Sequence, residues 1–251
     1  CQNCELCLTG RENICSRLER IGFEREGGFT EYLKVPARNF CSFSKDQPIE
    51  KMAILADAIG TPYHAITGLA KGRPGQKVLI VGASGGVGTF AVQLAKAFGA
   101  EVTGVCRTAK VDRVRSIGAD HVIDYKQDDF VQQGERYDLI LDIGGNRALS
   151  QLRRVLTPGG TLVIIGGEEG GRWLGGMDRW LRALLASPFV SHNLRSFVAK
   201  SSQEDLRLLK EMIEAGKVRP VIDRTFPLSE ASGALRYLEE GRVMGKVVIA
   251  V

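Results

Sequence analysis

Four cysteines lie within the first fifteen residues and could together hold a metal ion. Their spacing is C-x2-C-x2-C-x7-C, formed by Cys1, Cys4, Cys7 and Cys15. Each C-x2-C step lets two thiolates turn back onto one ion, and the longer loop brings the fourth sulfur round to close a tetrahedron. The alternative is two disulfides, but a chain of this size with only Cys41 and Cys106 besides is not a disulfide-dense secreted scaffold. We therefore predict a structural zinc site with no open position for a substrate.

A glycine-rich turn follows the aliphatic run Lys77–Val81 and could bind an anion. It matches the pattern G-x-G-x-x-G, with alanine in place of the first glycine, and it lies after a predicted strand and before a predicted helix. The second glycine lets the backbone approach a pyrophosphate, the third lets the helix pack tightly on the strand, and the helix N-terminus offers unpaired N–H groups. We predict a dinucleotide site rather than a plain strand–helix turn. Its residues are Ala83, Ser84, Gly85, Gly86, Val87 and Gly88.

The end of the next strand bears on which dinucleotide binds. An NAD site usually places Asp or Glu there, where the carboxylate binds the ribose 2′-hydroxyl. Here Cys106 is followed by Arg107, Thr108 and Lys110, with no carboxylate at the tip. A guanidinium can hold a 2′-phosphate through its fork, so we predict NADP, with NAD as the alternative cofactor. The competing interpretation is a surface arginine with no ligand.

Apolar runs alternate with helical patterns from residue 57 to about residue 216. Strands that are apolar on both sides, each followed by a helix, indicate a parallel sheet covered on both faces. The predicted fold class is therefore α/β, with a doubly wound parallel sheet of the Rossmann type. The expected strands are Lys77–Val81, Glu101–Cys106, His121–Asp124, Tyr137–Ile143, Thr161–Ile165 and Leu194–Val198, and the expected helices are Val87–Phe98, Val111–Ile117, Ala148–Leu156, Trp180–Leu185 and Gln203–Ala215.

The two ends of the chain differ from this central pattern. Residues 1 to about 56 are rich in loops, with one short strand expected at Glu31–Val35. The tail is expected to form a strand at Pro220–Phe226, a helix at Ser229–Glu240 with Ser229 as N-cap, and a last strand at Gly245–Val251. Because the chain begins on the first predicted zinc ligand, we expect it to lack the N-terminal part of the natural protein.

Composition narrows the class of protein. The 251 residues are 44% hydrophobic and 25% charged, as is ordinary for a soluble globular protein of one or two domains. The net charge of +5 is spread along the chain, which favours a solvated surface over nucleic-acid binding. No apolar run approaches the ~20 residues that cross a membrane. Thiolate ligands and unpaired cysteines favour a reducing compartment, so we expect a cytoplasmic protein.

Taken together, these motifs resemble the medium-chain dehydrogenase/reductase superfamily, which includes zinc alcohol dehydrogenases and quinone oxidoreductases. The resemblance covers nearly the whole chain: the cysteine loop, Gly27–Tyr32, Thr61–Ala65, Val78–Gly88 and Gly245–Ile249. It implies a GroES-like, β-rich catalytic domain built from both ends of the chain, with a Rossmann domain inserted between them. The expected boundaries are 1–56 for the first part with the zinc loop, 57–216 for the Rossmann domain, and 217–251 for the return to the catalytic domain.

The resemblance also implies an active site. The family's third ligand to a catalytic zinc lies a few residues before Thr61, which here is Asp57; an N-cap for the following helix is the alternative role. His64 is a candidate for proton relay, although a packed histidine near the cofactor is the more ordinary role. The family's other catalytic ligands, a Cys and a Gly-His-Glu motif, lie upstream and do not occur in this chain. The hydride site is expected to face Asp57, Gly144 and Gly166.

Three functions follow from these observations. The first is a zinc alcohol dehydrogenase-type oxidoreductase, which transfers a hydride between nicotinamide and an alcohol, aldehyde or ketone. The second is a zinc-free NADPH quinone or enone reductase, favoured by the form of the glycine turn. The third is an inactive nucleotide-binding subunit. Because the family often pairs the sixth Rossmann strand between subunits, we expect a homodimer or homotetramer.

Overall fold

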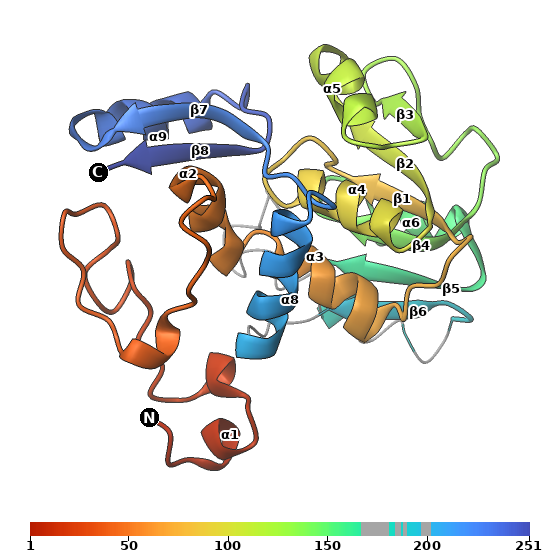
Figure 1. The fold of residues 1–251 in the computed structure, drawn as a ribbon. Helices are drawn as coiled ribbons and strands as arrows, with labels where there is room; N and C mark the ends of the chain where they lie inside the picture. The colour runs from red at the N-terminus through yellow and green to blue at the C-terminus, as the bar shows by residue number, and fades with distance from the viewer. Residues whose placement is uncertain (167–180, 184–186, 188–189, 197–201) are drawn as a thin grey trace.

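A six-stranded parallel sheet forms the centre of the molecule, and Figure 1 shows it on the right of the ribbon. The computed structural model describes residues 1–166, 181–183, 187, 190–196 and 202–251. The strand order β3-β2-β1-β4-β5-β6 is that of the dinucleotide-binding fold, in which the order reverses between β1 and β4. The predicted fold class is confirmed. The strands are β1 Lys77–Val81, β2 Glu101–Cys106, β3 His121–Asp124, β4 Tyr137–Asp142, β5 Leu156–Ile164 and β6 Asn193–Ser196.

Helices cover both faces of this sheet because alternate strand residues are apolar on each side. In β1, Val78 and Ile80 face one core, and Leu79 and Val81 face the other. Helices α3, α4, α5 and α8 bury apolar side chains in the first core, and α6 does so in the second. The helices are α1 Glu5–Leu8, α2 Ile49–Met52, α3 Gly60–His64, α4 Gly88–Ala97, α5 Val111–Ser116, α6 Leu149–Arg154, α8 Gln203–Glu214 and α9 Ala231–Glu239, with 3₁₀ turns η1 Glu12–Ile14, η2 Ala37–Asn39, η3 Ala53–Ala56, η5 Thr108–Lys110 and η7 Leu228–Glu230 and the π-helical turn η4 Ala65–Leu69.

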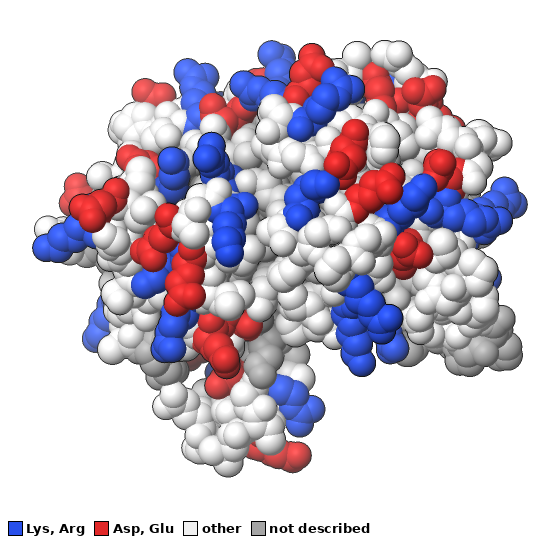
Figure 2. All heavy atoms as spheres, turned by 45° about the vertical axis from the view of Figure 1, so that its right-hand side comes forward, with Lys and Arg blue, Asp and Glu red and all other residues white. Residues whose placement is uncertain are grey.

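The C-terminal segment forms a second, smaller sheet. Strands β7 (Ile222–Pro227) and β8 (Lys246–Ala250) pair in parallel, and α9 connects them and packs on them. Figure 1 shows this unit on the left, away from the six-stranded sheet, with α8 between the N-terminal segment and the Rossmann helices. The space-filling view in Figure 2 shows basic and acidic side chains mixed over one face, so that neither sign covers a large continuous area there.

The fifth strand is longer than the sequence predicts. It begins at Leu156 rather than Thr161, so that Pro158 lies inside the strand. The register shifts between Tyr137 and Leu139, so the segment 157–160 bulges out opposite β4. A proline has no N–H for the ladder, and a bulge is one of the few places in a sheet that accepts it.

Two other predictions about local structure are wrong. The segment Glu31–Val35 is not a strand, because no neighbouring strand among the described residues pairs with it, and Tyr32 there is 88% exposed. Ser229 is not the N-cap of α9: it lies in η7, and Glu230 occupies the cap position without a side-chain hydrogen bond. By contrast, the Ser202 Oγ accepts the Asp205 N–H and caps α8.

Some expected elements lie partly outside the described residues. The sixth strand is described as Asn193–Ser196, and residues 197 and 198 of the expected span are not described. Of the helix expected at Trp180–Leu185, residues 181–183 are helical and the others lie outside the described part. Within the described residues, no helix has both the length and the apolar character that a membrane span requires.

Candidate functional site

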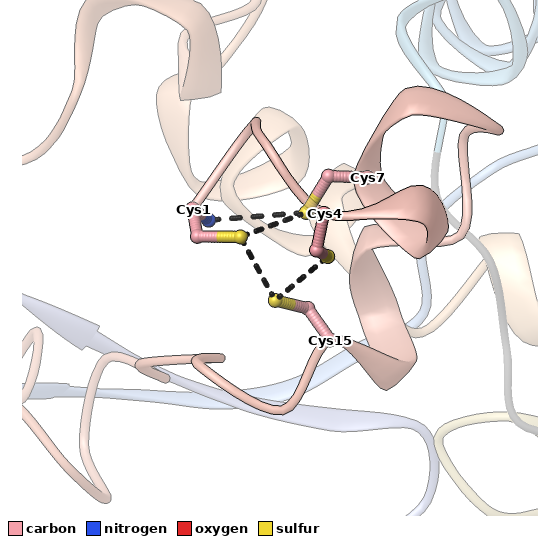
Figure 3. Close-up of side chains that lie close together, drawn as sticks. All are labelled: Cys1, Cys4, Cys7 and Cys15. Carbon is pink, nitrogen blue, oxygen red and sulfur yellow. Dashed lines mark hydrogen bonds between the residues drawn. The ribbon is translucent and has the colours of Figure 1, made fainter.

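The four cysteines predicted to bind zinc converge in the structure, and Figure 3 shows their sulfur atoms turned toward one another. All four Sγ atoms lie within 4.8 Å of one another, and the Cys1–Cys7, Cys4–Cys15 and Cys1–Cys15 separations are 3.7, 3.7 and 3.5 Å. Four sulfurs around one zinc ion at ~2.3 Å lie about 3.8 Å apart on a tetrahedron. The donor set and its spacing therefore fit zinc. The separations exceed the ~2.05 Å of a disulfide bond, so the alternative of two disulfides is wrong.

Backbone N–H groups donate to two of the sulfurs and favour the thiolate of Cys4, whereas burial and the neighbouring Cys7 and Cys4 thiols leave the pKa of Cys15 raised. The N–H of Cys7 lowers the pKa of the Cys4 thiol. The N–H of Arg17 donates to the Cys15 Sγ at 3.3 Å. Such donors stabilise negative charge on sulfur and orient the ligands of a metal.

The glycine turn between β1 and α4 has the geometry of a phosphate-binding loop. Gly82 has φ of 90°, a conformation that favours glycine, and its carbonyl accepts the Gly85 N–H at 3.2 Å. A Cβ atom at Gly88 would lie 2.0 Å from the Gly82 O, so the packing of the helix on the strand requires glycine there. A Cβ at Gly85 would meet the Gly82 O only at 3.6 Å, an ordinary contact. The folded turn does not need glycine at position 85, whereas close approach of a ligand does.

Lys246 at the start of β8 lies against this turn, a contact that its position in the sequence does not predict. The chain leading into β8 lies against the turn, because the Gly245 N–H donates to the Ser84 O at 3.0 Å. A Cβ at Gly86 would lie 2.5 Å from the Lys246 Cε and 3.0 Å from its Nζ. A lysine ammonium therefore lies over the N-terminus of α4, where both groups attract an anion. The one sequence feature that could indicate this contact is the dipeptide Gly245-Lys246, which lies about 160 residues away from the turn.

The end of β2 brings together several polar side chains. The Arg107 Nε donates to the Tyr125 Oη at 2.7 Å, and both side chains are exposed. The Lys110 Nζ donates to the Val243 O at 2.6 Å and the Gly241 O at 3.3 Å, which holds the C-terminal segment against this end of the sheet. Arg107 is therefore the more direct candidate for a 2′-phosphate, and Lys110 has a structural role beside it.

A carboxylate does lie beside β2, but on the neighbouring strand. Asp124 ends β3 and pairs in register with Cys106. A hydrogen bond from the Thr108 side chain lowers the pKa of Asp124, and the Lys126 N–H donates to its Oδ1 at 3.0 Å. Asp124 and Thr108 therefore organise the loop that carries Arg107.

The glycines predicted at the strand ends lie at the reversal of strand order. The Gly144 N–H donates to the Val81 O at 3.1 Å, across the gap between β1 and β4. A Cβ at Gly166 would lie 2.4 Å from the Ile143 O. Ligands of open α/β sheets bind in the crevice outside the carboxyl ends of the strands at this point, and side chains there would narrow it.

Comparison with known proteins agrees with this geometry. A family model described as "Zinc-binding dehydrogenase" matches residues 117–249. The NAD-dependent alcohol dehydrogenase of Sulfurisphaera tokodaii is 30% identical over 98% of this chain and 71% of its own length. The 2-methylene-furan-3-one reductase of Solanum lycopersicum is 34% identical over 91% of the chain, which spans about half of that relative (54%). A cobalt and zinc bound thermostable alcohol dehydrogenase from Pyrobaculum aerophilum has a TM-score of 0.80 at 28% identity, over 100% of this chain and 72% of that one.

This chain belongs to the medium-chain dehydrogenase/reductase superfamily. The resemblance found in the sequence is confirmed, as is the prediction of an NAD(P)-dependent oxidoreductase at the level of the family. The choice between NAD and NADP is a finer matter that family membership leaves open.

Two candidate site residues, Asp57 and His64, are not part of the cofactor turn. Asp57 is exposed after η3, and the N-cap position of α3 is occupied by Ile59, so its alternative role as a cap is wrong. Its role as a zinc ligand stays a prediction, because the four cysteines are the only cluster of three or more metal-type donors within the described residues. His64 ends α3, half-buried, and its Cε1 would lie 3.3 Å from a Cβ at Gly68. A role for it in proton relay likewise stays a prediction.

Cys106 is a buried thiol whose ionisation should make the stability of the protein depend on pH in the alkaline range. It is 2% exposed, and burial, with a smaller effect of the Asp124 charge, raises its pKa to about 11. From about pH 9 to pH 11 the unfolded chain loses this proton and the folded chain keeps it, so the free energy of unfolding falls as pH rises, by about 2 kcal/mol at most. In urea denaturation at pH 8 and pH 10.5, Cys106→Val should lose less stability than the wild type. An equal loss in both proteins would contradict the shifted pKa.

Proposed function

We propose that this chain carries the cofactor-binding part of an NADP(H)-dependent oxidoreductase of the zinc alcohol dehydrogenase type. The observation that carries the proposal is the glycine turn with the Lys246 ammonium over it, on the same chain as a four-cysteine zinc lobe. A nicotinamide cofactor, when bound, would supply the hydride chemistry, and the protein would supply binding and orientation. The substrate class is a small alcohol, aldehyde or ketone.

Different residues of this chain would bind different parts of the cofactor. Backbone N–H groups of the turn and the Lys246 ammonium would hold the pyrophosphate. Arg107, positioned by Tyr125, would hold the 2′-phosphate through its guanidinium. The strand ends at Gly144 and Gly166 would leave room for the rest of the cofactor in the crevice.

The two metal roles are separate in this proposal. The ion held by the four cysteines would stabilise the N-terminal lobe and take no part in the reaction, because its four ligands leave no open position. Asp57 is proposed as one ligand of a second, catalytic zinc, since a carboxylate oxygen is a suitable zinc ligand. Within the residues that the structure describes, no second cluster of metal-type donors includes Asp57.

An NADPH-dependent enone or quinone reductase is the second candidate. The form of the glycine turn favours it, and the Solanum lycopersicum relative bears the name of such a reductase. A structural zinc does not separate the two candidates, whereas the count of metal ions does. In the natural protein, two zinc ions per subunit by elemental analysis would support the first candidate, and one would support the second.

Reversing the charge of Arg107 should change which cofactor binds. In Arg107→Asp, affinity for NADPH should fall about 100-fold, because a charge-assisted contact with the 2′-phosphate is replaced by repulsion. Affinity for NADH should stay equal or rise, because the new carboxylate can accept the ribose 2′-hydroxyl. Fluorescence titration with both nucleotides measures the two constants. The matched control is Arg207→Asp, an exposed position on α8, which should change neither constant. Equal loss of NADPH and NADH binding in Arg107→Asp would contradict this assignment.

Assembly and compartment are part of the same proposal. We infer a homodimer or homotetramer that pairs the edges of β6 from two subunits, since β6 is the outermost strand on its side of the sheet. The cytoplasm is the proposed compartment, because four thiolate ligands require reducing conditions to remain available to zinc.

A further inference from the structure

A polar hollow of about 400 Å³ lies at the amino ends of the sheet strands, which is the end opposite the cofactor turn. Asp138 is near the start of β4 and Asn193 begins β6, whereas the cofactor crevice lies where β4 and β5 end. The loop before β1 closes the other side of the hollow. The lining residues used below are Lys71, Arg73, Asp138, Thr161, Asn193 and Arg195.

Within the described part of the chain, the positive side chains that line this hollow outnumber the negative ones. Among the described residues, Lys71, Arg73 and Arg195 form no ion pair with a carboxylate. Asp138, the one acid in the lining, has both oxygens occupied. Its Oδ2 accepts the Lys77 N–H at 2.9 Å, and its Oδ1 accepts the Thr157 hydroxyl at 3.0 Å. Three cations therefore face the hollow against one hydrogen-bonded carboxylate.

The parts that carry these cations are held in place. Lys71 follows η4 with φ of 49°, and the flanking Ala70 and Gly72 N–H groups donate to the Ala65 O and the Ile66 O. The Asn193 Nδ2 donates to the Gly159 O at 2.9 Å, which joins the start of β6 to the bulge of β5. Arg195 lies two residues further along β6, on the same face as Asn193 because side chains alternate along a strand.

A second hollow offers a comparison and has a different explanation. It lies where α4, α5 and α8 end, and it is lined by Lys96, Lys217 and Arg219. Cations at helix C-termini compensate the helix dipoles, and Lys96 also pairs with Asp120 at 2.8 Å. In the hollow at the amino ends of the strands, Lys71 follows a helix end, whereas among the described residues Arg73 and Arg195 adjoin no helix terminus and pair with no acid.

The positive surroundings extend to the other face of β6. Burial lowers the pKa of His192, and the guanidinium groups of Arg153 and Arg136 lower it further. The Arg153 Nε is buried without a hydrogen-bond partner. An anion near the start of β6 would therefore be attracted from both faces of the strand.

We propose that the hollow at the start of β4 and β6 binds a small polyanion whose charge is carried by phosphate or carboxylate groups. The volume suits a compact metabolite, and three cations with the Thr161 hydroxyl and the Asn193 amide suit charged oxygens better than an apolar ligand. This site is independent of the nicotinamide cofactor and of the proposed oxidoreductase function.

Calorimetric titration with inorganic pyrophosphate, and separately with citrate, tests the proposal at low ionic strength, where charge pairs are least screened. All proteins carry Lys246→Met, which removes the cation from the cofactor turn. We expect saturable binding of at least one probe, with Arg195→Gln weakening it about 10-fold, as loss of a charged hydrogen bond does. Lys71→Gly should weaken it similarly without cost to folding, because glycine adopts a positive φ freely.

The matched control is Arg207→Gln, which removes an exposed arginine on α8 away from the hollow and should leave the binding constant unchanged. Stronger binding of pyrophosphate than of citrate would identify phosphate as the preferred group, and the reverse would identify carboxylate. The proposal is overturned if neither probe binds saturably, or if Arg207→Gln weakens binding as much as Arg195→Gln. Binding of polyglutamate alone would also overturn it and would point to an acidic protein partner instead.

Discussion

Replacing Gly88 by alanine should destabilise the protein by about 3 kcal/mol, the upper end for an overpacked core, and should abolish nucleotide binding. The added methyl group would lie 2.0 Å from the Gly82 O and 2.8 Å from the Ala83 Cα. Both contacts are backbone atoms that a rotamer change cannot move, so α4 would have to shift away from β1. The shift would disrupt the helix N-terminus that binds the pyrophosphate. Urea denaturation and NADPH titration measure the two effects.

Gly85→Ala is the matched control, because it separates packing from binding. A Cβ there meets the Gly82 O at 3.6 Å, so the free energy of unfolding should change by less than about 0.5 kcal/mol. NADPH affinity should nevertheless fall about 10-fold, because the methyl group occupies the space that the pyrophosphate approaches. Unchanged affinity in Gly85→Ala would mean that the cofactor lies elsewhere. Full stability in Gly88→Ala would mean that the close packing of α4 is wrong.

Removing one zinc ligand should unfold the N-terminal lobe and leave the Rossmann core folded. Structural zinc contributes on the order of 10 kcal/mol to the folding of a small zinc domain. In this lobe only Cys7 and Cys15 are buried among residues 1–18, and neither apolar core includes any residue before Met52. Cys4→Ser should therefore release the ion and expose residues 1–18 to proteases. The free energy of unfolding of the Rossmann core should change by less than about 1 kcal/mol, as expected for units that share few contacts.

The control for the lobe is Cys41→Ser, because Cys41 lies outside the four-cysteine cluster. It should keep one zinc ion and the protease resistance of the wild type. Metal analysis and limited proteolysis report on both variants. If Cys4→Ser kept its zinc and its protease resistance, the assignment of this lobe as a zinc site would fail. If it kept both but lost turnover, the sulfur of Cys4 would have a catalytic role.

The parallel sheet could be predicted because the apolar pattern of its strands is visible in short stretches of the sequence. Runs such as Lys77–Val81 and Glu101–Cys106 are apolar on both sides, which only a strand between two layers of helices satisfies. The roles of Gly85 and Gly88 could be predicted as well, because the turn and the helix that they shape are directly consecutive in the chain. The convergence of the four cysteines was predictable for the same reason, since all four lie within one short loop.

Features that depend on pairing between distant segments could not be predicted in this way. The segment Glu31–Val35 has the composition of a strand, but a strand forms only where another lies beside it. Pro158 signals an end to helix or strand in the sequence, whereas the register of β4 against β5 leaves it in a bulge.

The sequence by itself determined the α/β class, the glycine turn after β1 and the cluster of four cysteines, because each depends on residues that are neighbours in the chain. Only the tertiary structure decided that Lys246 lies over the turn, that Lys110 holds the C-terminal segment, and that Lys71, Arg73 and Arg195 line one hollow. These arrangements arise when the end of the chain returns to the sheet and when separate strands come into register. Their electrostatic effects depend on distance in space, and spacing along the chain does not record that distance.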